Sequence, residues 1–155
     1  MTDKLDQKEM KVIVFQLMDM EYAINVDIVQ SIERVLSITR VPKTPAYVKG
    51  VINLRGIVTP IVDLRERFGL VSTEMDDHTR IIIVTLEDYE VGLIVDAAND
   101  VLDIPLDSIE PQPEVVGSIE SDFVSGVAKV GKHLLVMLNL DTVLEPVKRV
   151  TADEY

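Results

Sequence analysis

Cysteine and tryptophan are absent from this chain of 155 residues, and aromatic residues make up only 5% of it. Without cysteine the chain can form neither a disulfide framework nor a thiolate metal site. With so few aromatic side chains it lacks the means to build a stacking platform for nucleic-acid bases. These absences exclude small disulfide-bonded folds, cysteine-based metal folds and the usual binders of single-stranded nucleic acid.

A long apolar segment is also missing. No run approaches the roughly 20 residues that a helix needs to cross a bilayer, and the first ten residues contain no apolar signal region. Hydrophobic residues nevertheless make up 47% of the chain, which is too many for a disordered protein. The formal net charge of −12 repels nucleic acid and anionic lipid. We therefore expect a folded cytoplasmic protein with no nucleic-acid partner and no direct membrane insertion.

Signatures of catalysis and of metal binding are weak. His78 and His133 are isolated, and no pair of histidines has the spacing of a zinc site. Asp96, Asp100 and Asp103 could be read as a cation-binding loop, but the glycine and glutamate of an EF-hand loop are missing. We predict no catalytic residue, no metal site and no cofactor.

The sequence does contain an internal repeat. Residues 12–27 resemble residues 81–96 at an offset of 69. After a short insertion the offset becomes 76, so that residues 48–51 correspond to residues 124–127. A chain with two homologous halves is expected to bury two similar cores and to have a pseudo-symmetric seam between them. Function is then expected at that seam, or where the two copies differ.

Each half contains short β-branched and aromatic runs that are separated by turn residues, at the spacing typical of small all-β folds. About five strands are expected in each half, and closing each set into a barrel would remove exposed strand edges. The sequence thus predicts an all-β fold of two pseudo-repeated five-stranded barrels, with a single β-sandwich made from both repeats as the alternative. The few short helices are expected near residues 27–33, 64–69 and 141–145, with Asp27 and its repeat counterpart Asp96 interpreted as helix caps.

The polar segment at residues 71–78 is the best candidate for a link between the halves. Charged residues dominate both ends of the chain, which is typical of loosely held termini. Four regions are therefore predicted: a flexible N-terminus at residues 1–10, a first barrel at 11–75, a second barrel at 76–145 and a C-terminal tail at 146–155.

One hairpin differs between the two copies. In the first copy, residues 51–58 carry Arg55 between two unusually apolar strands, whereas residues 127–134 of the second copy contain no arginine. Arginine is favoured at interfaces because its planar fork binds carboxylates and stacks on apolar surface. A solvated turn arginine is the alternative interpretation.

The segments that follow the first hairpin of each copy would face each other across the seam. Ile28, Val29, Ile32, Val101 and Leu102 would then line an apolar groove wide enough for a partner helix. The alternative is that these side chains form a closed core between the halves. The pattern alone does not decide between a groove and a core.

Two sequence blocks indicate a family. Residues 48–56 read VKGVINLRG, and residues 59–65 read TPIVDLR. Together with residues 21–26 and 91–96, these blocks closely resemble the CheW-like domain family of bacterial chemotaxis coupling proteins. Such domains also occur at the end of the histidine kinase CheA and in CheV. The resemblance covers nearly the whole chain and implies two five-stranded SH3-like barrels with a shared core and no catalytic activity.

The resemblance also implies a function. CheW-like proteins bridge the cytoplasmic tips of chemoreceptors and the regulatory domain of CheA, so we expect a chemotaxis adaptor that is recruited to membrane-associated receptor clusters. The family binds the receptor tip, a helical hairpin, in a groove between the barrels, and it binds the kinase mainly through the first barrel. Carried over to this chain, the receptor-binding positions are Ile28, Val29, Ile32, Gly50, Arg55 and Val101. The kinase-binding positions are Ile38, Arg40, Val51, Arg55 and Val58.

The chain departs from the family pattern at one position. Many members have an acidic residue that could pair with the hairpin arginine where this chain has Ser31. The nearest acid in this chain is Glu33. The sequence therefore leaves the partner of Arg55 open.

Two other classes of function are alternatives to the adaptor. A small-ligand or metal-dependent enzyme built on tandem barrels would need convergent polar groups in a pocket, and the sequence shows no such set. A partner-binding module of a non-chemotactic system could use the same fold. Neighbouring genes for a kinase and for receptors would separate the second alternative from the adaptor.

Overall fold

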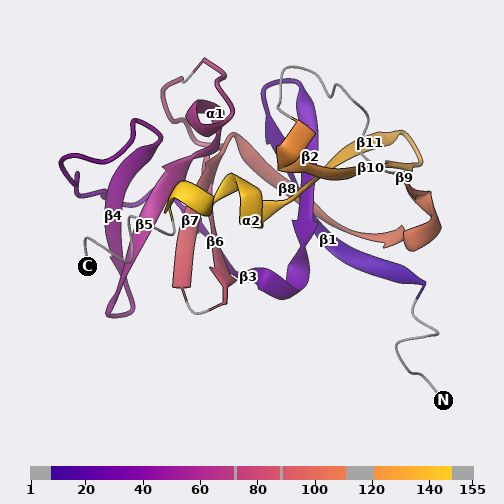
Figure 1. The fold of residues 1–155 in the computed structure, drawn as a ribbon, viewed down its shortest axis with the longest axis horizontal. Helices are drawn as coiled ribbons and strands as arrows, with labels where there is room; N and C mark the ends of the chain where they lie inside the picture. The colour runs from indigo at the N-terminus through magenta and orange to yellow at the C-terminus, as the bar shows by residue number, and fades with distance from the viewer. Residues whose placement is uncertain (1–7, 72, 88, 111–120, 148–155) are drawn as a thin grey trace.

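The computed structural model describes residues 8–71, 73–87, 89–110 and 121–147. Its strands are β1 (Glu9–Leu17), β2 (Met20–Asn25), β3 (Val29–Arg34), β4 (Val48–Leu54), β5 (Ile57–Asp63), β6 (Arg80–Leu86), β7 (Tyr89–Val95), β8 (Ala97–Pro105), β9 (Ile109–Glu110), β10 (Val124–Val130) and β11 (His133–Leu138). They form two sheets that lie side by side (Figure 1). One sheet has the strand order β8-β1-β2-β11-β10-β9, and the other has the order β3-β6-β7-β5-β4.

Each sheet closes on itself. After β3 the chain reaches β4, where Thr39 and Val51 exchange two backbone hydrogen bonds of 2.9 and 2.8 Å. In the other sheet β9, which follows β8 in the chain, pairs with β10 and completes the same side of the barrel. The predicted all-β fold of two SH3-like barrels with few short helices is therefore confirmed, and the single sandwich is not formed.

The barrels do not correspond to the two halves of the chain. β1 and β2 share a sheet with β8, β9, β10 and β11, whereas β6 and β7 share a sheet with β3, β4 and β5. The first hairpin of each repeat is thus exchanged: β1 pairs with β8, and β6 pairs with β3. The predicted barrels at residues 11–75 and 76–145 are wrong for this reason.

The chain passes between the barrels at two places, the 3₁₀ turn η2 (Val26–Ile28) and Asp96. The strands between these crossings, within residues 29–95, form what we call the continuous barrel. The remaining strands, within residues 9–25 and 97–138, form what we call the split barrel. The seam of the molecule therefore contains both crossings as well as the contact between the barrels.

The exchanged hairpins form the wall between two kinds of core. In β1, Val12 and Val14 pack inside the split barrel, whereas Ile13, Phe15 and Leu17 pack in a larger core shared by both barrels. β6 repeats this arrangement between the shared core and the interior of the continuous barrel. Because both faces of these strands are buried, their sequences are continuously apolar rather than alternating. The predicted shared core is confirmed.

Barrel closure requires glycine at two equivalent bulges. Gly50 in β4 has a φ of 145°, and a Cβ atom there would lie 2.1 Å from the carbonyl oxygen of Thr39. Gly126 in β10 occupies the corresponding bulge, where a Cβ atom would lie 2.7 Å from the carbonyl oxygen of Glu110. No non-bonded carbon can approach an oxygen so closely, so any larger residue would push the closing segment away.

The helices predicted after the second hairpin of each copy are present. α1 (Leu64–Arg67) follows the N-cap Asp63, whose Oδ1 accepts a hydrogen bond from the backbone N of Arg65 at 2.9 Å. α2 (Leu140–Val143) follows the N-cap Asn139 in the same way. Two further 3₁₀ turns are η3 (Leu106–Ser108) and η4 (Ser121–Phe123).

The helix predicted at residues 27–33 is instead the single turn η2, after which β3 begins. Its N-cap is Asn25, whose Oδ1 accepts a hydrogen bond from the backbone N of Asp27 at 2.8 Å. Asp27 is therefore not the cap. The run that follows η2 contains the β-branched residues Val29 and Ile32, and pairing with β6 stabilises it as a strand.

The fold extends into both predicted flexible ends. β1 begins at Glu9, within the N-terminal region predicted at residues 1–10. Val147 is fully buried in the shared core, so the tail predicted at residues 146–155 begins inside the fold. Residues 1–7 and 148–155 of these ends lie outside the described residues. Among the described helices, none has the length and apolar character needed to span a membrane.

Candidate functional site

The seam between the barrels carries four of the predicted receptor-binding residues. η2 contacts both β1 and β6, which places Ile28 and Val29 at the seam, partly buried against the shared core. Ile32 in β3 and Val101 in β8 are 41% and 53% exposed and occupy equivalent positions in the two repeats. Leu102 packs on the interior of the split barrel and does not line the seam. The seam is thus core on its inner side and presents apolar side chains to solvent on its outer side.

Gly50, another predicted receptor-binding residue, is buried at the bulge of β4. Its Cα lies against the backbone of Thr39, so it shapes the path of β4 and presents no side chain to a partner.

Arg55 lies at the tip of the hairpin formed by β4 and β5. Arg55 and Gly56 have φ values of 52° and 83°, the left-handed conformation at both central positions that a type I′ turn needs. The backbone N of Gly56 donates a hydrogen bond to Asn53 Oδ1 at 3.0 Å, which fixes the turn. The Arg55 side chain is exposed and forms no ion pair with any residue in the described part of the chain.

Ser31 does not supply a partner for this arginine. Its Oγ is buried and has no hydrogen-bond partner among the described residues. The Arg55 guanidinium is therefore available to another molecule.

The predicted kinase-binding residues lie on one part of the continuous barrel. The bridge that closes this barrel pairs Thr39 with Val51 in β4. The flanking residues Ile38 and Arg40 therefore direct their side chains to the other face from Val51, and Ile38 packs against the interior of the barrel. In the neighbouring strand β5, Val58 is 49% exposed and follows Ile57, which is 48% exposed. We call this surface the hairpin face; its residues are Ile38, Arg40, Val51, Arg55, Ile57 and Val58.

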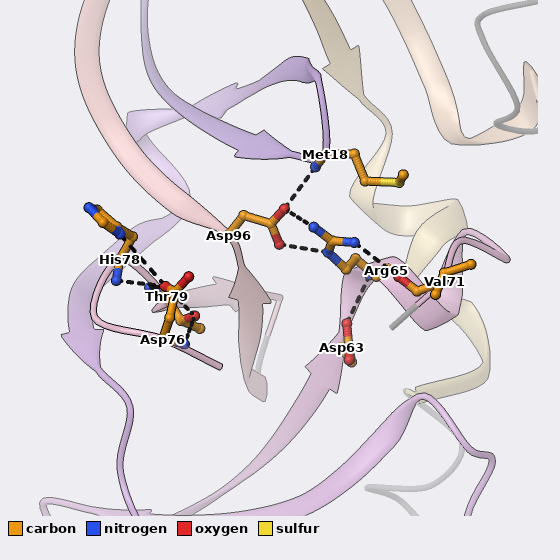
Figure 2. A network of polar contacts seen from close by, with 8 residues as sticks. All are labelled: Met18, Asp63, Arg65, Val71, Asp76, His78, Thr79 and Asp96. Carbon is orange, nitrogen blue, oxygen red and sulfur yellow. Dashed lines mark hydrogen bonds and ion pairs between the residues drawn. The ribbon is translucent and has the colours of Figure 1, made fainter. Parts of the chain in front are cut away.

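Figure 2 shows a network that the sequence interpretation missed. Arg65 in α1 donates from Nε to Asp96 Oδ1 at 2.7 Å, and its Nη2 forms an ion pair with Asp96 Oδ2. Asp96 Oδ2 also accepts a hydrogen bond of 2.8 Å from the backbone N of Met18, in the turn between β1 and β2. Arg65 Nη1 donates to the carbonyl oxygen of Val71 at 3.0 Å. We call this network the clasp, because it joins the split barrel to the continuous barrel at a chain crossing.

Asp96 therefore serves as an ion-pair partner and not as a helix cap. Its hydrogen bonds raise the pKa of the Arg65 guanidinium, so the guanidinium is held in its charged form. The available signal was Arg65 itself, which ends the block TPIVDLR directly after an apolar strand. A mostly buried arginine needs an acidic partner, but the sequence does not show which of its 27 acidic residues is the one.

The two histidines have acidic neighbours. His133 Nδ1 lies 2.8 Å from Glu21 Oε1, beside the parallel pairing of β2 and β11. The backbone N of His78 donates a hydrogen bond to the exposed Asp76, which lowers the pKa of that carboxyl group (Figure 2). Within the described ranges, no group of three or more histidine or acidic residues could hold a metal ion. The features of the described residues that bear on function are thus the two apolar surfaces and the clasp.

Comparison with known proteins adds independent evidence. Residues 11–148 match the family model of the CheW-like domain. The chain is 45% identical over 135 residues to the chemotaxis protein CheW of Bacillus subtilis strain 168, covering 87% of this chain and 86% of that protein. It is 31% identical over 141 residues to the chemotaxis protein CheW of Klebsiella aerogenes, covering 91% and 85%. The crystal structure of the scaffolding protein TtCheW from Thermoanaerobacter tengcongensis superposes with a TM-score of 0.83 at 38% identity, covering 88% and 92% of the two chains.

Proposed function

Because this chain belongs to the CheW-like domain family, we propose that it is a non-enzymatic adaptor that couples the cytoplasmic tips of chemoreceptors to the histidine kinase CheA. A role in chemotaxis as a scaffolding protein follows from the family itself and from the names of its relatives. We propose both the identity of the two partners and the residues that bind each of them. Binding to receptor tips would recruit the protein to membrane-associated receptor clusters.

The observation that carries the proposal is the presence of two separate surfaces with exposed apolar residues. At the seam, Ile32 and Val101 are exposed, and Ile28 and Val29 support them from the core side. Such a pair of apolar side chains on adjoining barrels suits the apolar face of a helical hairpin, which is the form of a receptor tip. We assign the seam to the receptor.

The hairpin face is assigned to the regulatory domain of CheA. Protein interfaces favour exposed β-branched side chains beside an arginine, and Arg55 has no ion-pair partner among the described residues. The hairpin face lies on β4, β5 and residues 38–40, whereas the exposed seam residues lie on β3 and β8. Arg55, which the sequence assigns to both partners, lies at the hairpin tip and is placed here with the kinase surface. On this assignment the two surfaces use different strands, and both partners can bind at once.

A bridge transmits a signal only if the receptor state changes the free energy of kinase binding or of the kinase conformation. A bridge without such coupling would only raise the local concentration of the kinase. In this chain β3 carries Ile32 of the seam, and its continuation at residues 38–40 closes on β4 in the hairpin face. We propose this continuous segment as the connection through which the two surfaces influence each other.

Nuclear magnetic resonance tests the assignment of the two surfaces. Isotopically labelled protein is titrated with the regulatory domain of CheA from the same organism, and a receptor-tip fragment is then added. We expect amide shifts on the hairpin face with the kinase domain and along the seam with the receptor fragment. Absence of shifts with both partners would contradict the proposal, and overlapping shifts would contradict the separation of the surfaces.

The same titration measures the coupling. The affinity for the kinase domain is determined with and without saturating receptor fragment. A ratio that differs from one gives the coupling free energy directly. A ratio of one would support the bridge without coupling.

A further inference from the structure

A cavity of about 690 Å³ opens beside the hairpin face. The loop between β3 and β4 forms most of its wall, and Met75 closes it from the segment before β6. The volume lies within the range of ligand pockets in proteins, about 300–1,000 Å³. The lining residues used below are Ile38, Arg40, Val41, Lys43, Lys49 and Met75.

The charge of this cavity is opposite to that of the protein. Arg40, Lys43 and Lys49 line it and no acidic residue does, although the chain has a formal net charge of −12. Lys49 forms an ion pair with Glu66 in α1, which holds its side chain. Arg40 and Lys43 are exposed and form no ion pair with any residue in the ranges that the structure describes.

The positive charge is not a property of the repeat. In the first copy, residues 38–49 contain three basic residues and no acidic one. In the second copy, residues 106–125 follow the corresponding strand and contain five acidic residues and no basic one. The two copies therefore differ in sign at equivalent places, which marks this loop as a specific feature of the continuous barrel.

We propose that this cavity receives an acidic segment of the CheA regulatory domain, in which a carboxylate is flanked by aliphatic side chains. The inference rests on the proposed function, because it names a chemical feature of the same kinase partner. Ile38 and Arg40 belong both to the hairpin face and to the cavity wall, so the cavity continues the proposed interface. Arg40 and Lys43 would pair with the carboxylate, while Ile38, Val41 and Met75 would contact its aliphatic neighbours.

The cations that line the cavity also favour the encounter between this protein and an acidic partner. A protein with a net charge of −12 repels an acidic segment at long range. A local group of cations such as Arg40 and Lys43 makes one part of its surface attractive and orients the encounter. Lys43 has a φ of 65°, a left-handed conformation that is uncommon for lysine and defines the path of the loop.

The test uses the full chain and the CheA regulatory domain from the same organism. Dissociation constants are measured by calorimetry at low and high NaCl for the wild type, Lys43→Gln and Lys43→Glu, with Lys129→Glu as the control. Lys129 is an exposed lysine on β10 of the split barrel, so its reversal makes the same change in net charge away from the cavity. Thermal melting verifies that each variant is folded.

We expect Lys43→Gln to weaken binding about two- to fivefold at low salt and Lys43→Glu to weaken it about tenfold or more. The salt dependence should decrease in both variants, and Lys129→Glu should bind like the wild type. Equal affinity of the wild type and Lys43→Glu would overturn the inference while leaving the adaptor intact. Failure of the wild type to bind the kinase domain would overturn the adaptor and the inference together.

A second measurement separates a small anion from the kinase segment. Labelled protein is titrated with citrate, a tricarboxylate, and the amides of residues 38–49 are followed. Competition between citrate and the kinase domain would support a shared carboxylate site. Citrate binding that leaves the affinity for the kinase domain unchanged would assign the cavity to small anions and overturn the proposal.

Discussion

Substitution of Arg65 by methionine would remove the clasp and keep most of the aliphatic volume of the side chain. The change deletes the hydrogen bond and the ion pair to Asp96 and the hydrogen bond to the carbonyl of Val71. A hydrogen bond to a charged group contributes roughly 1.5–3 kcal/mol when it is buried. The Arg65 side chain is 14% exposed and that of Asp96 is 29% exposed, so water compensates part of the loss. We expect the free energy of unfolding to fall by about 2–3 kcal/mol.

Thermal unfolding followed by circular dichroism measures this effect. For a chain of this length, 1 kcal/mol corresponds to roughly 2–4 °C, so the melting temperature should fall by about 4–12 °C. Arg80→Met is the matched control, because within the described ranges the hydrogen bonds of Arg80 Nη1 go to the nearby carbonyl oxygens of Asp77 and Thr79. We expect that variant to lose less than about 1 kcal/mol.

A double-mutant cycle with Asp96→Asn assigns the loss to the pair itself. The asparagine keeps an oxygen for the backbone N of Met18 and removes the charge that faces Arg65. The two single losses should exceed the loss of the double variant by about 1–2 kcal/mol. Additive losses, or a melting temperature of Arg65→Met within about 1 °C of the wild type, would refute the clasp as a stabilising element.

Three further predictions follow from the burial and geometry of single residues. Gly50→Ala should cost about 3 kcal/mol or more in urea unfolding, because the new Cβ collides with a backbone carbonyl. Gly69→Ala should cost about 1 kcal/mol, because among the described residues no atom beyond its chain neighbours lies within 4 Å of the new Cβ. Equal losses would contradict the closure argument. Val101→Asp should weaken receptor-tip binding in calorimetry without lowering the melting temperature, and Leu134→Asp, on a residue of similar exposure, should not; unfolding of the first variant would identify Val101 as core. Burial raises the pKa of Tyr22 from 10.0 to about 12. The neutral, buried Tyr22 therefore stabilises the fold fully below pH 10. As the pH rises from 10 towards 12, the free energy of unfolding should fall by about 2–3 kcal/mol. Tyr22→Phe should reduce this alkaline loss in circular dichroism, and identical alkaline curves for the two proteins would contradict the prediction.

The repeat in the sequence predicts the architecture well because equivalent residues have the same structural role in both copies. Gly50 and Gly126 are aligned by the repeat, and both close a barrel by the same bulge. Asp63 and Asn139 are aligned as well, and both cap a short helix. Residues that determine local geometry, such as a glycine at a bulge or a cap at a helix start, can therefore be recognised in the sequence.

The exchange of hairpins could not be predicted from the same pattern. β1 and β6 are nearly equivalent apolar strands, so either one satisfies the local requirements of either barrel. Whether β1 or β6 joins a given barrel depends on the segments that connect the strands across the seam and on the packing of the whole shared core. The continuous apolar character of both strands indicates burial on two faces, but it does not identify the neighbouring strand.

The candidate surfaces were predicted to different degrees. Ile32 and Val101 were found because they are apolar at equivalent positions, and both are exposed. The clasp was missed because its two charged residues lie 31 positions apart on elements that meet only in the folded chain. The basic cavity was missed because Lys43 and Lys49 are unremarkable in sequence, and their common environment arises from the loop that surrounds them.

The two chain crossings are the covalent links between the barrels. A rotation about the line that joins them would leave both links intact, but the shared core and the hydrogen bond from Arg67 Nε to the carbonyl oxygen of Val143 oppose it. The crossings are η2, beside Ile28 and Val29 of the proposed receptor surface, and Asp96, which the clasp holds. A receptor helix that pressed the barrels apart would therefore rotate them about this axis. The clasp and the shared core would resist that rotation. The hairpin face would move together with the continuous barrel, to which it belongs.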